Sequence, residues 1–200
     1  MPIVLFVAGS GPTDRDGNQP GLKAQSTKLL AQGLASRGIA SLRYDKAGVA
    51  ESGEAAPKSE RDLRFEIYSS DVARLVRALR AERRFEKVIV AGHSEGSLLG
   101  LIAAREEAID GFISLAGAGR PIQTVLREQL TNNIADRSLL EQALRILSEL
   151  EAGRTTRDVP SPLASLFRPD VQPYLISWMK HDPAREMGAL RAPALIVQGT

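Results

Sequence analysis

The sequence predicts an α/β fold with a mostly parallel sheet, and two observations carry this prediction. Over residues 1–119, short apolar segments rich in β-branched side chains alternate with longer segments that have helical spacing. Strands that alternate with helices form parallel sheets, because each helical crossover returns the chain to the same end of the sheet. Over residues 120–190 only helical patterns occur, and a strand pattern returns at 194–198. We therefore expect helices on both faces of the sheet and a helical cap inserted before that last strand.

Residues 1–119 are predicted to form the core, in the order strand, helix, strand, helix, strand, helix, strand. The predicted strands are Ile3–Ala8, Ile39–Tyr44, Val88–Ala91 and Gly111–Leu115. The predicted helices are Leu22–Arg37, Phe65–Arg84 and the segment from Gly96 to Arg105. A polar loop, Asp45–Arg61, follows the second strand. The first helix is expected to carry its apolar face on Leu22, Leu29, Leu30 and Leu34.

Residues 120–190 are predicted to form the cap, and residues 191–200 the return to the core. Pro121 favours the start of a first cap helix, and Gly153 ends a second one. The apolar residues of the second helix are Leu139, Leu140, Leu144, Leu147 and Leu150. A linker is expected over Thr155–Pro162 and a third helix over Val171–Lys180. The last predicted strand, Ala194–Gln198, follows a proline, which a strand tolerates at its start.

The stretch Gly92-His-Ser94-Glu-Gly96 lies between the third predicted strand and the helix that follows it. A glycine–x–serine–x–glycine turn in this context is the pattern of a nucleophile elbow. Its serine adopts a strained backbone conformation, from which the hydroxyl projects clear of the sheet. The strand end and the helix start approach closely, so positions 92 and 96 require glycine. Ser94 is thus predicted to be a nucleophile that lies at the N-terminus of a helix. The free N–H groups of that terminus point at the site and favour a developing negative charge.

The composition excludes several other kinds of site. The 200 residues contain no cysteine, which excludes disulfides and thiolate zinc sites, and only two histidines, which excludes a histidine-rich metal site. A net charge of +2 gives no indication of nucleic-acid binding, and no apolar run reaches the length of a membrane span. No signal peptide is visible, so we expect a cytoplasmic location. The sequence begins directly with a predicted strand, so the question whether a further segment precedes it stays open. We expect no cofactor and no metal.

Some charged residues have a structural rather than a functional interpretation. Asp14 and Asp16 could bind a cation, but we interpret them as partners for their own loop and for Arg15 or a neighbour. Arginines recur on one side of the helix Phe65–Arg84, where interspersed acidic residues indicate a solvated face. His93, inside the elbow, is interpreted as packed structure rather than as a base.

Three stretches carry a resemblance to the α/β-hydrolase superfamily. They are Gly92–Gly96 at the elbow, Ala8-Gly-Ser-Gly-Pro-Thr-Asp-Arg-Asp-Gly-Asn18 after the first strand, and Arg43-Tyr-Asp-Lys46 after the second. The chain resembles bacterial capped serine esterases related to the dienelactone-hydrolase and acylaminoacyl-peptidase-like groups. The resemblance implies an α/β-hydrolase fold, acyl-transfer chemistry and a helical cap, with Asp45 as a structural residue near the elbow. After Asp45 the chain departs from the pattern Asp-x-Arg-Gly-x-Gly-x-Ser of many members.

The resemblance also implies roles for individual residues. Ser94 would be the nucleophile, and the backbone N–H groups of Glu95 and Ser10 would be the two donors of the oxyanion hole. Tyr174 and Trp178 would line the acyl pocket from the cap. The alternative, that these two aromatic side chains pack the cap onto the core, stays open.

A Ser–His–acid mechanism also needs a histidine to accept the serine proton and a carboxylate to orient that histidine. In α/β hydrolases the order along the chain is nucleophile, acid, histidine, so both are expected beyond residue 200. His181 precedes the last strand, beside an Asp-Pro pair that indicates a helix start, and we do not expect it to be catalytic. The chain would then be the core and cap of a serine hydrolase, cut short at both ends.

The sequence therefore predicts a serine hydrolase that cleaves carboxylic esters of small molecules through an acyl-enzyme at Ser94. Two alternatives stay open: a peptide or amide hydrolase with the same residues, and a catalytically incomplete binding protein with a vestigial elbow. The strand Ala194–Gln198 would form a sheet edge with apolar surface uncovered. A homo-oligomer or a companion chain would cover that edge.

Overall fold

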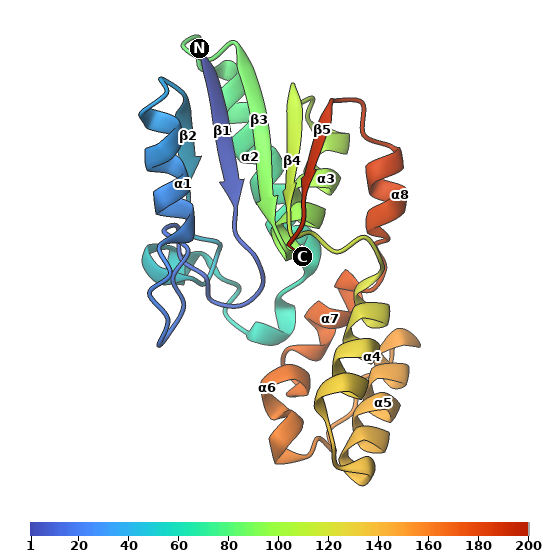
Figure 1. Ribbon diagram of the computed structural model, residues 1–200. Helices are drawn as coiled ribbons and strands as arrows, with labels where there is room; N and C mark the ends of the chain where they lie inside the picture. Colours follow the sequence, from blue (N-terminus) through green and yellow to red (C-terminus); the bar gives the residue numbers. More distant parts are fainter. Residues whose placement is uncertain (200) are drawn as a thin grey trace. The chain divides into compact units, whose positions relative to one another are not determined.

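A computed structural model describes residues 1–199 of the chain, and these residues form two compact units. The sheet unit, as we name it, comprises residues 1–56, 68–118 and the chain from 185 onward. The helical unit comprises residues 57–67 and 119–184. Two separate segments of the chain therefore build the helical unit, and the longer one lies in sequence between the fourth and fifth strands (Figure 1).

Five strands form one sheet in the order β2-β1-β3-β4-β5, and all four pairings are parallel (Figure 1). The strands are β1 (Pro2–Val7), β2 (Ala40–Arg43), β3 (Lys87–His93), β4 (Gly111–Leu115) and β5 (Ala194–Val197). The parallel sheet and its predicted strands are thereby confirmed. The inner strands β1 and β3 bury most of their side chains, as continuous apolar runs between two helical layers require.

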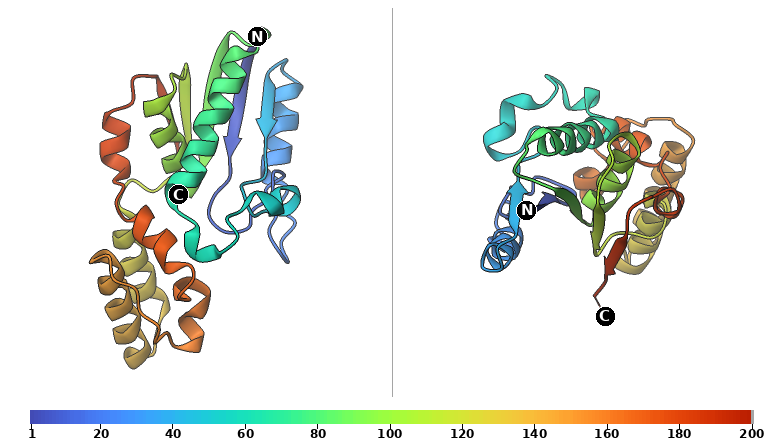
Figure 2. Two further views of the ribbon diagram at one scale, coloured as in Figure 1. Left: turned by 180° about the vertical axis from the view of Figure 1, so that it is seen from behind. Right: turned by 90° about the horizontal axis from the view of Figure 1, so that it is seen from above.

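Helices cover both faces of the sheet, as predicted (Figure 2). Helix α1 (Ser26–Ala35) lies on one face, where its Ala31 packs in a cluster with side chains of β1 and β3. Helices α2 (Phe65–Ala81) and α3 (Glu95–Glu106) lie on the other face. Helix α8 (Pro183–Gly188) precedes β5 and starts at the predicted Asp-Pro pair.

Helix α1 starts later than predicted, at Ser26 instead of Leu22. Leu22 and Gln19 exchange two backbone hydrogen bonds in a tight turn, and this pairing keeps Leu22 out of the helix. Gln25 then adopts φ of 50°, a left-handed conformation that cannot continue a right-handed helix. The loop before α1 is therefore longer than the sequence indicates.

The predicted apolar face of α1 is wrong at three of its four leucines. Leu22, Leu29 and Leu30 are 58%, 59% and 48% exposed. The face that meets the sheet consists of the buried Ala31 and the partly buried Leu34. The helix therefore meets the sheet through a small side chain and Leu34, and Leu29 and Leu30 remain in solvent.

The strand order places a topological switch point between β1 and β3. From β1 the chain passes through α1 to β2 on one side, and from β2 it passes through α2 to β3 on the other side. Open parallel sheets bind ligands outside the carboxyl ends of the strands at such a point. The loop that begins at Ala8 and the turn that contains Ser94 both follow strands at this switch point.

The helical unit contains the three helices predicted for residues 120–190. They are α4 (Ile122–Asn133), α5 (Arg137–Glu151) and α7 (Gln172–Trp178). Helix α5 starts where the carboxylate of Asp136 accepts the N–H of Leu139, a capping contact, and it ends just before Gly153, whose φ is 75°. Both ends of α5 are therefore fixed by local residue chemistry.

Several short helical segments were not predicted. They are η1 (Ala50–Ala55) and η2 (Glu60–Asp62) in the polar loop, and η3 (Ser161–Leu163) and α6 (Ala164–Phe167) at and after the predicted linker. Segments of one or two turns are too short for an apolar periodicity to appear in a sequence. The predicted loop and linker therefore contain more ordered backbone than their composition indicates.

Strand β5 lies at one edge of the sheet, and all four of its residues are exposed. Leu195, Ile196 and Val197 are 55%, 63% and 46% exposed. An edge strand presents unpaired backbone donors and acceptors, and here it also presents apolar side chains. The apolar surface expected at this edge is therefore present.

Candidate active site

The turn between β3 and α3 has the backbone of a nucleophile elbow. Ser94 adopts φ of 51° and ψ of −117°, a combination that residues with a side chain rarely take, directly between the strand and the helix. Its N–H donates to the carbonyl oxygen of Leu115, at the end of β4, over 2.9 Å. The predicted strain at Ser94 is confirmed, and the partly exposed side chain lies at the carboxyl edge of the sheet.

Two glycines make this turn sterically feasible. A Cβ atom on Gly92 would lie 2.3 Å from the carbonyl oxygen of Gly96, and one on Gly96 would lie 2.3 Å from that of Val7. Both contacts involve backbone atoms, which cannot rotate away as a flexible side chain can. The predicted requirement for glycine at positions 92 and 96 is confirmed, and it arises because α3 packs against the ends of β1 and β3.

The loop after β1 lies beside the serine. A Cβ atom on Gly9 would come within 3.3 Å of the Ser94 Cβ, so the absence of a side chain brings this loop against the elbow. Ser10 and Ser94 line one cavity of about 220 Å³. Its walls also include Thr13, Gln19, Leu22, Ser26 and Thr27. The structure thus brings together two of the predicted site residues, Ser10 and Ser94.

A buried ion pair that the sequence analysis did not identify lies next to the elbow. The Nζ of Lys46 donates to Oε1 of Glu95 over 3.0 Å and to the carbonyl oxygen of Gly9 over 2.6 Å. The side chains of Lys46 and Glu95 are 2% and 1% exposed. Buried charges are costly unless they are paired and hydrogen-bonded, as these are. One signal could have revealed the pair: a lysine and a glutamate of opposite charge lie within three residues of the ends of two strands.

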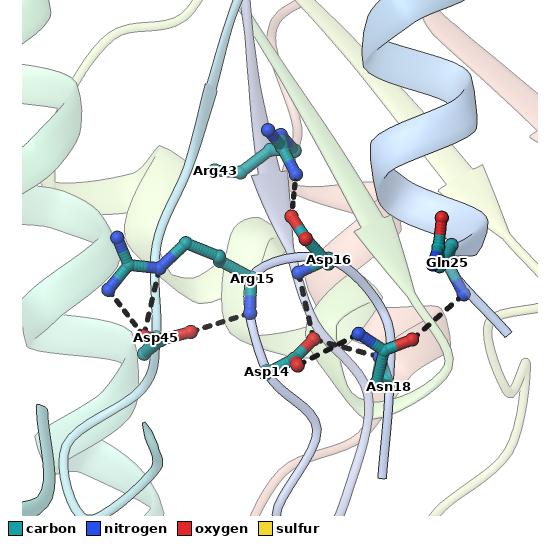
Figure 3. Close-up of polar contacts among 7 residues, drawn as sticks. All are labelled: Asp14, Arg15, Asp16, Asn18, Gln25, Arg43 and Asp45. Atoms are coloured by element: carbon teal, nitrogen blue, oxygen red, sulfur yellow. Dashed lines mark hydrogen bonds and ion pairs between the residues drawn. The ribbon is translucent and has the colours of Figure 1, made fainter. Parts of the chain in front are cut away.

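Figure 3 shows how the acidic residues of the loop after β1 are used. Asp14 accepts the N–H groups of Asp16 and Asn18 and the side-chain amide of Asn18, and Asp16 pairs with Arg43 of β2. Burial alone would raise the pKa of Asp14, but these hydrogen bonds, chiefly those from Asn18, lower it below its usual value. The interpretation that these carboxylates serve their own loop and a neighbour is confirmed.

Asp45 joins the same loop to the end of β2. It accepts the N–H of Arg15 over 2.6 Å and the Nε of the guanidinium over 2.9 Å (Figure 3). Burial by itself would raise the pKa of Asp45, but the hydrogen bonds from Arg15 hold it below its usual value. The structural role that the resemblance implies for Asp45 agrees with these contacts.

His93 is exposed and lines the cavity beside Ser94, so its interpretation as packed structure is wrong. Its Nδ1 lies 3.0 Å from the point where a Cβ of Gly9 would be. Because the neighbouring residue is glycine, no side chain covers the imidazole from that direction. The ring therefore contributes to the wall of the cavity.

Tyr174 and Trp178 pack around Phe65 within the helical unit. The rings of Phe65 and Trp178 stack 5.2 Å apart, and the Tyr174 ring lies 6.0 Å from each. His181 lies 5.5 Å from the Phe65 ring, and its Nε2 lies 3.5 Å from Oε1 of Glu66. These contacts give both predicted pocket residues a packing role, and their role in an acyl pocket stays a prediction.

Within residues 1–199, Ser94 takes part in hydrogen bonds through its backbone only.

The same residues contain no group of three or more His, Cys, Asp or Glu side chains that could hold a metal ion. None of the helices described is both long and apolar enough to cross a membrane. The described site therefore consists of a strained serine, a neighbouring glycine loop and a helix N-terminus.

A strained serine turn of this kind can occur in more than one protein family, and comparison with known families identifies the family of this chain. The amino-acid sequence matches the family described as serine aminopeptidase, S33, over residues 21–200. The chain belongs to this family of α/β hydrolases. The match covers the elbow and the helical unit, so the resemblance to α/β hydrolases is confirmed.

This S33-family chain is 30% identical over 201 residues to the esterase EstD of Thermotoga maritima. The alignment covers all of this chain and 46% of EstD. The chain therefore spans about half the length of the curated relative that it matches.

Solved structures of esterases share the fold of this S33-family chain. Est1E from Butyrivibrio proteoclasticus, solved with ferulic acid bound, matches with a TM-score of 0.64 at 16% identity, over 100% of this chain and 69% of that one. A thermophilic esterase from Thermogutta terrifontis matches with a TM-score of 0.55 at 17% identity, over 98% and 70%. At such identities the likeness concerns the fold, and it confirms the predicted α/β-hydrolase fold.

Proposed function

We propose that this chain provides the nucleophile and the oxyanion hole of a serine hydrolase that cleaves carboxylic esters of small molecules through an acyl-enzyme. The observation that carries the proposal is the strained Ser94 at the switch point, beside the glycine loop after β1. A positive φ at a serine costs free energy that the surrounding packing must offset, and such strain gathers at functional sites. The esterase relative from Thermotoga maritima supports an ester as substrate.

The proposed reaction uses the carboxyl edge of the sheet. The Oγ of Ser94 attacks the ester carbonyl carbon, its proton passes to a general base, and negative charge develops on the carbonyl oxygen. The N–H groups of Ser10 and Glu95 donate to that oxygen, and the N-terminus of α3 adds its positive potential. The alcohol leaves with the proton from the base, and water then releases the acyl group from Ser94.

We place the general base and its carboxylate partner outside residues 1–200. The order nucleophile, acid, histidine along α/β-hydrolase chains supports this placement. So does the greater length of EstD, of which the chain spans 46%. The predicted roles of residues 120–190 as a cap, and of Tyr174 and Trp178 as acyl-pocket residues, belong to the same proposal.

A peptide or amide hydrolase is a second candidate, because the family description names a serine aminopeptidase. Both candidates use Ser94, but an amine must be protonated before it leaves, whereas a phenolate leaves readily. The ratio of kcat/KM for an aminoacyl p-nitroanilide to that for p-nitrophenyl acetate separates them. A ratio well above one would favour the aminopeptidase.

The experiment uses the complete natural protein. A fluorophosphonate should label Ser94, as located by mass spectrometry, and should stop the hydrolysis of p-nitrophenyl acetate. Ser94→Ala should lower kcat/KM by about a thousandfold or more, because it removes the attacking atom. Ser36→Ala, at the exposed end of α1, is the matched control and should keep full activity. A folded protein that is neither labelled nor active would favour the binding-protein alternative.

A further inference from the structure

One buried ammonium contacts both segments that carry the proposed oxyanion donors. The Nζ of Lys46 lies 2.6 Å from the carbonyl oxygen of Gly9 and 3.0 Å from Oε1 of Glu95. The ring of Tyr68 lies on a third side, with its centroid 4.9 Å from Nζ. An ammonium has three N–H donors, so two oxygens and one aromatic face satisfy it. Water does not compete for these contacts, because Lys46 and Glu95 are almost fully buried.

The contact with Gly9 fixes the direction of the next N–H group. The carbonyl of Gly9 and the N–H of Ser10 belong to one peptide group, and none of the peptide bonds described is cis. In a trans peptide the C=O and N–H bonds point in opposite directions. Because the Gly9 oxygen points at the buried Lys46, the Ser10 N–H points away from it, and Ser10 itself lines the cavity together with Ser94.

The contact with Glu95 acts on the second donor. Glu95 is the first residue of α3, and its own backbone N–H is the donor proposed. Its carboxylate is held by the ammonium that holds the carbonyl of Gly9. Lys46 therefore fixes the first turn of α3 relative to the loop after β1, and so the spacing between the two donors.

We infer that Lys46 is a positioning residue, which aligns the N–H groups of Ser10 and Glu95 for the oxyanion of the tetrahedral intermediate. The inference rests on the proposed function and extends it to a residue outside the reacting groups. Lys46 acts through Gly9 and Glu95 and does not touch the substrate. Oxyanion donors stabilise the transition state more than the bound substrate, so loss of Lys46 lowers kcat with little change in KM.

The test compares Lys46→Met with the double variant Lys46→Met/Glu95→Leu in the complete protein, on p-nitrophenyl acetate. Lys46→Met leaves a buried carboxylate unpaired, so its thermal midpoint also falls. The double variant removes both charges, and its midpoint should recover. We expect kcat to be about ten- to a hundredfold lower in both variants, a smaller loss than that of a whole donor, with KM within about threefold of the parent.

If the pair of Lys46 and Glu95 had a purely structural role, kcat would recover together with the thermal midpoint in the double variant. That result would overturn the inference. Val76→Ala is the matched control for lost stability, because Val76 is fully buried in α2 and does not line the cavity. Its kcat should equal that of the parent below the melting range. If Lys46→Met does not fold, the double variant decides alone.

The fluorophosphonate separates failure of this inference from failure of the proposed function. A parent protein that is not labelled at Ser94 contradicts the function. A parent that is labelled and hydrolyses the ester, together with variants of unchanged kcat, overturns only the role of Lys46.

Discussion

Asp45 and Lys46 are neighbours in the sequence, and both hold the loop after β1. Asp45 accepts hydrogen bonds from Arg15, whereas Lys46 donates one to the carbonyl of Gly9. The end of β2 thus orders the loop that carries Ser10 through one anion and one cation. Hydrogen bonds to charged groups are stronger than neutral ones, so two residues can order a loop that has little regular structure.

We predict that Asp45 makes the stability of the protein depend on pH in the acid range. The hydrogen bonds from Arg15 lower the pKa of Asp45 in the folded state, so its ionised form stabilises the fold above about pH 4, the usual aspartate range. This contribution is lost as the pH falls below that range toward the lowered pKa. Asp45→Asn should therefore reduce the urea midpoint at pH 7 and flatten its dependence on pH below about 4.

The control is Asp158→Asn, at an exposed position of the helical unit. It should leave the urea midpoint and its pH dependence as in the parent. If Asp45→Asn had the same acid dependence as the parent, Asp45 would not be the source of the effect.

Single residues differed in how far the sequence could predict them. Ser94 was predictable because a local sequence pattern of strand, glycines and helix identifies it. The pairing of Lys46 with Glu95 was not, because it joins the ends of β2 and β3, which lie on opposite sides of β1 in the sheet. The exposure of His93 was missed because it depends on a glycine in another loop, Gly9.

At the scale of elements, the elbow depends on how closely α3 approaches the strands. We predict that Gly96→Ala lowers the free energy of unfolding by about 3 kcal/mol or more, because its Cβ would meet the backbone of β1. The variant should also react more slowly with a fluorophosphonate, since the elbow must shift. Urea unfolding and the labelling rate measure the two effects.

Gly33→Ala, in the helix α1, is the matched control. Its Cβ would meet nothing within 4 Å, so it should raise the free energy of unfolding by about 0.5–1 kcal/mol. Similar effects of the two substitutions would show that close packing does not govern the elbow.

Elements with strong periodicity were predicted well, and elements defined by tertiary contacts were not. Helices α2 and α5 follow their apolar patterns, because those patterns match the faces that they bury. The inner strands and α3 are apolar runs buried on more than one side. The pattern of α1 was misleading, because the residue that the helix buries against the sheet is the small Ala31 rather than its leucines.

At the scale of the whole molecule, the main feature is the apolar surface that β5 and α1 of the sheet unit leave in solvent. It includes Leu195, Ile196 and Val197 of β5, and Leu29 and Leu30 of α1. We predict that residues 1–200, expressed alone, self-associate at micromolar concentration and hydrolyse p-nitrophenyl acetate poorly. Light scattering and an ester assay measure both properties.

The edge strand provides the control for that prediction. Ile196→Lys places a charge on β5, which should reduce self-association, because charged edge strands resist pairing with another edge. A stable monomer with ordinary esterase turnover would contradict the prediction. It would mean that a base within these residues serves Ser94.

The position of the longer segment of the helical unit between β4 and β5 has a consequence for the order of folding. Before Ile113 can pair with Leu195, the chain must close a loop that contains α4, α5 and α7. Closing a long flexible loop has an entropic cost, and non-local pairing of this kind slows folding. A helical unit that has already folded shortens the flexible part of that loop. We therefore expect the sheet to complete its hydrogen bonds at β5 last, after the inserted helices have formed.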